Sequence, residues 1–125
     1  MRKWFALGWI LLLVACQVNE ADAPEVQTEE AQQIGSTSVV MGAEIREIGP
    51  VKPVNYGFLW DTQSDVTIAT AKNKVILGSA TDPRKFSIKL DKLVPATLHY
   101  YRGFAANGDY SVIYYGGIVT FTTLP

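Results

Sequence analysis

The side chains that most often carry out catalysis or bind metals are scarce in this chain of 125 residues. It has one histidine, His99, and one cysteine, Cys16. Acid–base catalysis needs partners held within hydrogen-bond reach, and a metal site needs two or three further ligands, but the sequence near His99 supplies neither. Gly78-Ser79-Ala80 lacks the glycine spacing of a nucleophile elbow. We therefore expect no catalytic residue, no metal site and no cofactor, and interpret His99 as structural.

The first 15 residues have the pattern of a secretory signal. Met1-Arg2-Lys3 is a short positive start, and residues 4–15 are uncharged and almost entirely apolar. An apolar run of this length is too short for a helix that crosses a hydrocarbon core, which takes about 20 residues. It suits the hydrophobic region of a signal peptide.

Leu13-Val14-Ala15-Cys16 resembles the lipobox of bacterial lipoproteins. In that family the cysteine thiol receives a diacylglycerol, the signal is cut before it, and the new amine takes a further acyl chain such as palmitate. The resemblance implies that residues 1–15 are removed and that Cys16 is a lipidated membrane anchor, because two or three acyl chains hold a protein firmly. An ordinary signal peptide with a chance cysteine is the alternative. Gln17 after the cysteine implies the outer membrane, with the periplasmic or surface face left open.

The composition changes after the anchor. Residues 17–33 contain five acids and no base, so we expect 16–33 to be the lipidated cysteine and an acidic flexible tether. A first strand beginning at Pro24 is left open as an alternative. Residues 34–125, the expected domain, carry 9 bases and 7 acids. Without a basic stripe, binding to nucleic acid is excluded.

Alternating apolar and polar residues predict strands from Ser36 onward. Short turn-rich segments separate them, and no long helical pattern occurs. Asn107-Gly108-Asp109 predicts a hairpin turn in which Asn and Gly adopt positive φ. About seven antiparallel strands indicate an all-β, immunoglobulin-like sandwich. The expected strands are 39–45, 54–60, 66–68, 75–77, 86–90, 99–106 and 111–123.

Leu93-x-Pro95-x-Thr97 and the strand from Tyr100 to Asn107 match the pattern Leu-x-Pro-Gly-Thr-x-Tyr-Tyr-x-Arg-Ala-Tyr-Ala-x-Asn. This pattern resembles that of fibronectin type III domains in secreted and lipid-anchored bacterial proteins. Tyr115-Gly116 and Phe121-Thr122-Thr123 match its last strand, and residues 56–60 match its C strand. The resemblance spans roughly Pro24 to the C-terminus and is most specific in residues 93–123. His99 replaces the corner tyrosine. No tryptophan lies between Ser38 and Arg46, where animal domains bury one, and Trp60 is the substitute we expect in the core.

One set of aromatic residues is a candidate interaction surface. If His99 and Tyr101 point inward, then Tyr100, Arg102 and Phe104 lie on the outer face of the same strand. We expect Tyr114 (or Tyr115) and Tyr56 or Trp60 beside them on neighbouring strands. Aromatic residues with an arginine carry binding energy in protein interfaces and stack on sugars. The alternative is cross-strand pairing that only stiffens the sheet.

The sequence supports three functional hypotheses. The first is a lipid-anchored, non-catalytic module of the cell envelope that binds a protein or a glycan. The second is a structural or spacer lipoprotein without a ligand. The third is an accessory subunit of an envelope complex such as a polymer-uptake system. The sequence does not identify a ligand or a partner.

Overall fold

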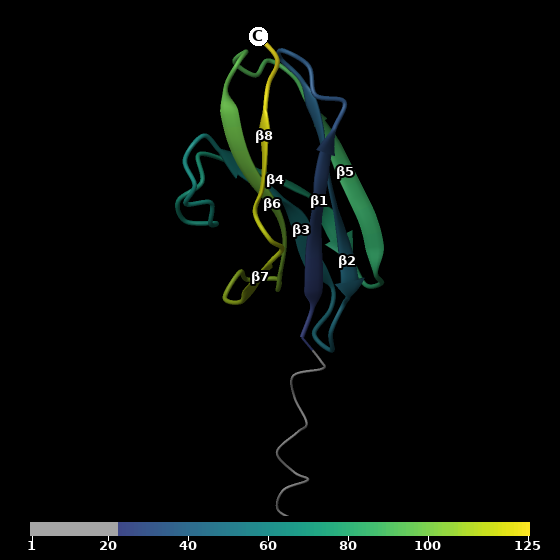
Figure 1. The fold of residues 1–125 in the computed structure, drawn as a ribbon. Helices are drawn as coiled ribbons and strands as arrows, with labels where there is room; N and C mark the ends of the chain where they lie inside the picture. Colours follow the sequence, from purple (N-terminus) through teal and green to yellow (C-terminus); the bar gives the residue numbers. More distant parts are fainter. Residues whose placement is uncertain (1–22) are drawn as a thin grey trace, which may run out of the picture.

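The computed structural model describes residues 23–125, so the predicted signal, lipobox and most of the tether, Cys16 included, lie outside the described residues. This part of the chain folds into eight β-strands and no helix (Figure 1). The strands are β1 (Glu25–Gln32), β2 (Val39–Glu47), β3 (Val54–Asp61), β4 (Asn73–Ala80), β5 (Arg84–Leu90), β6 (Leu98–Ala106), β7 (Ile113–Tyr115) and β8 (Val119–Thr122).

The strands form two antiparallel sheets that pack face to face. The first sheet has the order β1-β2-β5, and the second has β4-β3-β6-β7, with β8 also paired to β6. The prediction of an all-β sandwich is confirmed. The N-terminal end of the described chain and the C-terminus lie at opposite ends of the sandwich (Figure 1).

The first strand lies inside the stretch that composition assigned to the tether. β1 pairs antiparallel with β2 from Glu25 to Gln32, so the alternative of a first strand near Pro24 is correct, and the sandwich begins at Glu25 and not at Ile34. Val26 supplies the reason, because it is 9% exposed and belongs to the core. An edge strand exposes one side to water, where acidic side chains are favourable and discourage pairing with other chains. An acidic composition therefore does not exclude a strand here.

Two further expectations about the strands are wrong. Residues 66–68 lie in the connection between β3 and β4 and form no strand. The Val66 side chain packs on the outer face of the second sheet, and its backbone is not paired with a strand. The expected long strand 111–123 is divided into β7 and β8 at Gly116-Gly117.

The β6–β7 loop also differs from the expectation. Its positive φ occurs at Tyr110, at 61°, and not at Asn107 or Gly108. The Tyr110 N–H donates to the Asn107 carbonyl at 3.0 Å, and the Val112 N–H donates to the Asn107 side-chain oxygen at 3.0 Å. The Asn107 side chain therefore shapes a longer loop than the predicted tight turn.

The main core lies between the two sheets. β2 supplies alternate inward residues, among them Met41 and Ile45, which are 0% exposed, and they face Phe58 and Tyr101 from the second sheet. Phe58 packs against Phe86 with ring centroids 5.0 Å apart, within the range of favourable aromatic pairs. Trp60, the expected substitute for the missing tryptophan of β2, packs against this core but is only partly buried.

Two hydrogen bonds join the sheets between β1 and β6. The Gly103 N–H donates to the Thr28 hydroxyl at 3.0 Å, and the Tyr101 hydroxyl donates to the Glu29 carbonyl. Burial raises the pKa of Tyr101 to about 12, so its hydroxyl remains a donor at neutral pH. These contacts lie where β6 changes partner from β8 to β7. β1 is therefore paired within the first sheet and is also hydrogen-bonded to β6 of the second sheet.

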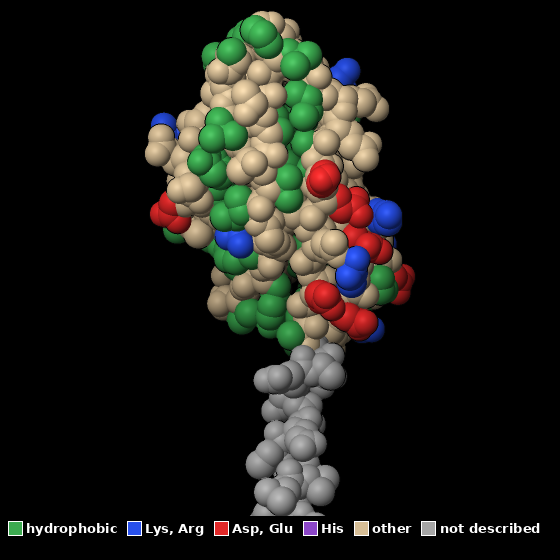
Figure 2. Space-filling model, viewed as in Figure 1, with side chains coloured by type: hydrophobic (Ala, Val, Ile, Leu, Met, Phe, Trp, Pro, Cys, Tyr) green, Lys and Arg blue, Asp and Glu red, His purple; other side chains and the backbone are tan. Residues whose placement is uncertain are grey.

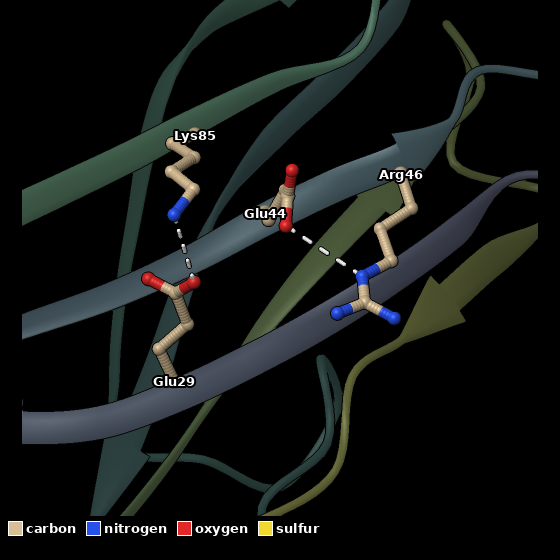
Figure 3. Close-up of polar contacts among 4 residues, drawn as sticks. All are labelled: Glu29, Glu44, Arg46 and Lys85. Atoms are coloured by element: carbon tan, nitrogen blue, oxygen red, sulfur yellow. Dashed lines mark ion pairs between the residues drawn. The ribbon is translucent and has the colours of Figure 1, made fainter.

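The outer face of the β1-β2-β5 sheet carries charges. Glu29 of β1 pairs with Lys85 of β5 at 3.7 Å, and Glu44 pairs with Arg46 at 3.6 Å within β2 (Figure 3). Such exposed pairs contribute little stability, about 0–1 kcal/mol each. Their main effect is to keep this face soluble.

The hydrogen bond from the Tyr101 hydroxyl to the Glu29 carbonyl should contribute to the stability of the sandwich. We expect Tyr101→Phe to lower the free energy of unfolding by about 1–2 kcal/mol, because the Glu29 carbonyl loses its donor inside the protein. Urea denaturation measures this loss. Tyr110→Phe is the matched control, because the Tyr110 hydroxyl is buried and has no hydrogen-bond partner among the described residues. This control should leave stability unchanged or raise it. Equal losses in both variants would contradict the proposed link.

Candidate functional site

The outer face of the second sheet is covered by the connection between β3 and β4. Residues 62–72, which we call the covering loop, place Val66 (1% exposed) against Leu59, Phe104 and Ala106, all 0% exposed. This second cluster is separate from the main core. Ile68, Ala71, Tyr100, Tyr110, Ile113 and Tyr115 surround it, partly buried.

The covering loop is closed at its base by Asp61. The Asp61 carboxylate accepts hydrogen bonds from the backbone N–H of Thr62 at 2.7 Å, of Gln63 at 3.2 Å and of Lys72 at 3.0 Å. Burial on its own would raise the pKa of Asp61, but these donors and the Lys72 charge hold it below its usual value. The carboxylate therefore shapes the loop by accepting three backbone hydrogen bonds, which is a structural role.

Arg102 holds the loop against the sheet. Its Nη1 donates to the Val66 carbonyl at 3.1 Å, its Nε donates to the Gly116 carbonyl at 2.9 Å, and its guanidinium lies 4.6 Å from the centre of the Tyr115 ring. Burial lowers the pKa of Arg102 from its usual value, and Tyr115 opposes that effect. The Tyr115 hydroxyl accepts from the Ile68 N–H at 2.9 Å. The arginine and the tyrosine therefore act as structural clamps.

The structure separates the residues of the predicted interaction surface. Tyr100, Arg102 and Phe104 do point to the outer face, but the covering loop leaves Phe104 0% exposed and Arg102 partly buried. Phe104 is paired with Tyr115, whereas Tyr114 is paired with Ala105 of the core and belongs to the other face. The expected exposed aromatic surface is therefore wrong for Phe104 and for Tyr114.

The two aromatic residues expected on β3 also point the other way. Tyr56 is paired with Ala105 and Trp60 with Tyr101, and both pack against the main core. Leu59, paired with Arg102, is the β3 residue on the outer face.

His99 fits a structural role. It is 4% exposed and stacks on Phe121 with ring centroids 4.9 Å apart and planes 9° from parallel. Its Nδ1 lies 3.1 Å from the Thr97 carbonyl, so the imidazole makes a local backbone contact at the corner before β6. This is the position that the resemblance gives to the tyrosine.

Exposed hydrophobic side chains gather at the two ends of the sandwich. We call the end where the described chain begins the proximal pole: it comprises Ala23-Pro24, the β2–β3 connection (48–53) and the β6–β7 loop (107–112). The opposite end, with the C-terminus, is the distal pole (Figure 1). The nine residues of β6 run between the poles, a length of roughly 26 Å at about 3.3 Å per residue.

Four exposed hydrophobic residues form a patch at the distal pole. The Leu124 N–H donates to the Gly35 carbonyl at 2.9 Å, the Ala96 N–H donates to the Leu124 carbonyl at 3.0 Å, and Leu98 is paired with Thr122. These bonds bring three segments of the chain together. The members of the distal patch are Ile34 (36% exposed), Val94 (65%), Leu98 (44%) and Leu124 (53%).

A hollow adjoins the distal patch. It has a volume of about 370 Å³ and lies between the ends of β3 and β5 and the β5–β6 connection. Trp60, His99 and Val94 line it together with Lys72, Lys92 and Asp91. Sequence reasoning missed this site because its residues come from separate loops and no spacing in the sequence brings them together.

Within residues 23–125, no three His, Cys, Asp or Glu side chains are placed to hold a metal ion. The same range contains no helix of the length and apolarity that a membrane span requires.

Comparison with known proteins identifies the class of fold. No family model and no curated protein matches the chain. Among solved structures, the sensor domain of the anti-sigma factor RsgI4 of Pseudobacteroides cellulosolvens is similar, with a TM-score of 0.61, 17% identity and coverage of 84% of this chain and 98% of that domain. The fibronectin type III domain of human fibronectin type III domain containing protein 3 has a TM-score of 0.56, 14% identity and coverage of 86% and 93%. Domains A168–A170 of titin match with a TM-score of 0.52, 19% identity and coverage of 83% and 32%.

The strand order and these neighbours define a fibronectin type III-like β-sandwich with an immunoglobulin-like architecture. Identities below 20% show the fold alone.

Removing the guanidinium of Arg102 should loosen the covering loop. We expect Arg102→Met, which keeps an apolar stem, to lower the free energy of unfolding by about 1–3 kcal/mol, because two carbonyls lose a charged donor. Amide exchange at Ile68 and Lys72 should accelerate while the centre of β6 stays protected. Arg84→Met is the control, because Arg84 is exposed and lies 5.8 Å from the Tyr56 ring centre without reaching the loop. Unchanged exchange in Arg102→Met would contradict the clamp.

Proposed function

We propose that this protein is a lipid-anchored, non-catalytic interaction module of the cell envelope. Cys16 is its acylated anchor, and the outer membrane is its location. The β-sandwich presents the distal patch to a partner. The observation that supports this proposal best is the arrangement of the two poles: the segment leading to Cys16 joins one end of the sandwich, and the distal patch lies at the other. An anchor at the proximal pole leaves the distal patch accessible.

The chemistry of the distal pole favours a protein partner over a glycan. Four hydrophobic side chains, each at least 36% exposed, come from three adjacent segments. Clustered exposed hydrophobic residues mark interaction sites, whereas isolated ones are ordinary. The hollow beside them adds charged groups of both signs at the rim, which suits a protein interface with an apolar centre and a polar edge.

The similarity to sensor domains is compatible with a recognition role. The absence of a catalytic role rests on His99 and Asp61: both are buried, and both are engaged with the backbone near them. A structural spacer and an accessory subunit of an envelope complex remain the alternatives.

The anchor is tested by replacing the acylated cysteine. We expect Cys16→Ser to move the protein from the membrane fraction to the soluble fraction, because no acyl chain can then be attached. Mass spectrometry of the natural protein should show an N-terminal Cys16 with its acyl chains. Gln17→Asn keeps the thiol and should leave the protein in the membrane. A natural protein with residues 1–15 still attached would contradict the anchor.

The distal patch is tested by cross-linking in intact cells. A photoreactive benzoylphenylalanine at position 98 should give a discrete adduct with one envelope protein. Val94→Ser combined with Leu124→Ser should abolish the adduct without changing the melting temperature, because both side chains are largely exposed. Ile76→Ser is the control, because Ile76 is 46% exposed on β4 and lies outside the patch. No adduct, or an equal loss in the control, would favour the spacer hypothesis.

A further inference from the structure

The proximal pole carries a second apolar surface that the proposed partner site does not use. A hollow of about 240 Å³ opens there between the start of the described chain and two loops. All of its lining residues are uncharged, and they include Pro24, Pro50, Val51, Val112 and Tyr114. Val51 is 66% exposed and Val112 is 43% exposed. Figure 2 shows hydrophobic side chains at this end of the molecule, next to the point where the chain enters.

We propose that the proximal pole docks onto the lipid bilayer that holds the anchor. Val51 and Val112 then enter the boundary between headgroups and acyl chains. This proposal rests on the proposed function, because it requires an acylated Cys16. It adds a defined orientation: the sandwich stands on the membrane on one pole instead of moving freely above it.

The segment between Cys16 and the first described residue is short enough to keep the proximal pole near the membrane. Six residues lie between Cys16 and Ala23, which lines the hollow. The seven Cα-to-Cα steps that join the two residues span at most about 25 Å when fully extended. The two loops therefore stay within a short distance of the bilayer. Over such a linker the effective concentration of the bilayer is high, so even weak apolar contacts hold the docked state.

The charges near the pole are compatible with docking. Lys52 follows Val51, and Asp109 lies in the β6–β7 loop with Val112; both side chains are exposed. Hydrogen bonds from Ser111 lower the pKa of Asp109, so it is ionised at neutral pH. The ends of β1 and β2 and the β4–β5 turn lie at the same end of the sandwich and add the exposed charges of Glu25, Arg46, Glu47, Asp82 and Arg84. Acidic groups are therefore in slight excess at this end. Apolar contact, and not attraction to anionic lipids, supplies the affinity, so docking onto a zwitterionic bilayer should depend little on salt.

The strand that enters the domain limits how the sandwich can tilt. β1 begins at Glu25, two residues after Ala23, and is paired with β2 from its first residue. The charged outer face of the β1-β2-β5 sheet lies to one side of the pole, as Figure 2 shows for the acidic and basic side chains. Tilting that face into the bilayer would bury Glu29 and Lys85, so contact through the uncharged lining of the hollow is favoured.

The experiment uses the mature acylated protein in vesicles of phosphatidylcholine, which carry no net charge. Acylation consumes the single natural cysteine, so Val51→Cys introduces the one free thiol, which is labelled with the fluorophore NBD. We expect a blue-shifted emission and strong quenching by a nitroxide carried on the lipid acyl chain near the headgroup. The same label at Val94→Cys, 65% exposed at the distal pole, should show neither effect.

Two further variants test whether the quenching at position 51 depends on the apolar surface of the proximal pole. With the label at position 51, Val112→Asp should reduce quenching several-fold, because a carboxylate must then approach the acyl region. Val94→Asp is the matched control and should leave quenching unchanged. Raising the salt concentration should also leave it unchanged.

The outcomes separate this proposal from the proposed function. Mass spectrometry of the same preparation reports acylation: unacylated protein would overturn the proposed anchor itself. Acylated protein with equal, weak quenching at positions 51 and 94 would leave the anchor intact and overturn the docking. A blue shift at position 51 that disappears when the protein is diluted at constant lipid would identify a second copy of the chain as the occupant of the pole, and would also overturn bilayer docking.

Discussion

The contact between the middle of β1 and the middle of β6 is the constraint on which the rest of the sandwich depends. At Gly103, β6 has left β8 and not yet joined β7, so its N–H is satisfied by the Thr28 hydroxyl across the sandwich. The approach is close enough that a Cβ on Gly103 would lie 2.7 Å from the Cβ of Ala43, and a Cβ on Gly116 would overlap Thr28. Neither position has room for a Cβ atom, so both residues must be glycine. A buried amide without this acceptor would cost more than the bond itself contributes.

The two outer faces of the sandwich meet water in different ways. The three-stranded sheet uses charges on all of its strands, while the larger sheet has a second apolar cluster under the covering loop. The loop adds Val66 to Leu59 and Phe104 and is fixed by Asp61, Arg102 and Tyr115. The covering loop thus buries aromatic side chains that this face of the sheet would otherwise expose. Most of the exposed large hydrophobic side chains then lie at the poles.

Much of the fold was predictable from local patterns. Alternation identified the positions of β2 and β5, because one face of each strand packs on the core and the period of two is then visible in the sequence. β3 and β6 bury residues on both faces, so β3 was recognised by its aromatic residues and β6 by its resemblance to the family pattern. β1 was offered only as an alternative, because the acidic residues that an edge strand tolerates are also typical of a tether. Gly116-Gly117 is a local signal for a break that the prediction of one long strand did not use. The contact with Thr28, 88 residues earlier, which leaves no room for a Cβ on Gly116, is visible only in the tertiary structure. The inward and outward assignment of β6 was also correct.

The candidate site was harder to predict for the same reason. Whether Phe104 is exposed depends on a loop more than thirty residues earlier in the chain, and nothing near Phe104 indicates that cover. Tyr114 was assigned by counting along a single strand, but the register with β6 places Tyr115 opposite Phe104. The apolar poles combine residues from three or more segments, so only the tertiary structure brings them together.

The position of β1 has a mechanical consequence. Its Glu25 end faces the proximal pole, and its Gln32 end faces the distal pole, where it is paired with Val40 of β2. A pull between the membrane and a partner on the distal patch would run along the axis of this strand. The hydrogen bonds between β1 and β2 lie across that axis, so they would share the load together in shear instead of opening one after another. The arrangement therefore resists unfolding under tension more than its modest number of ion pairs suggests.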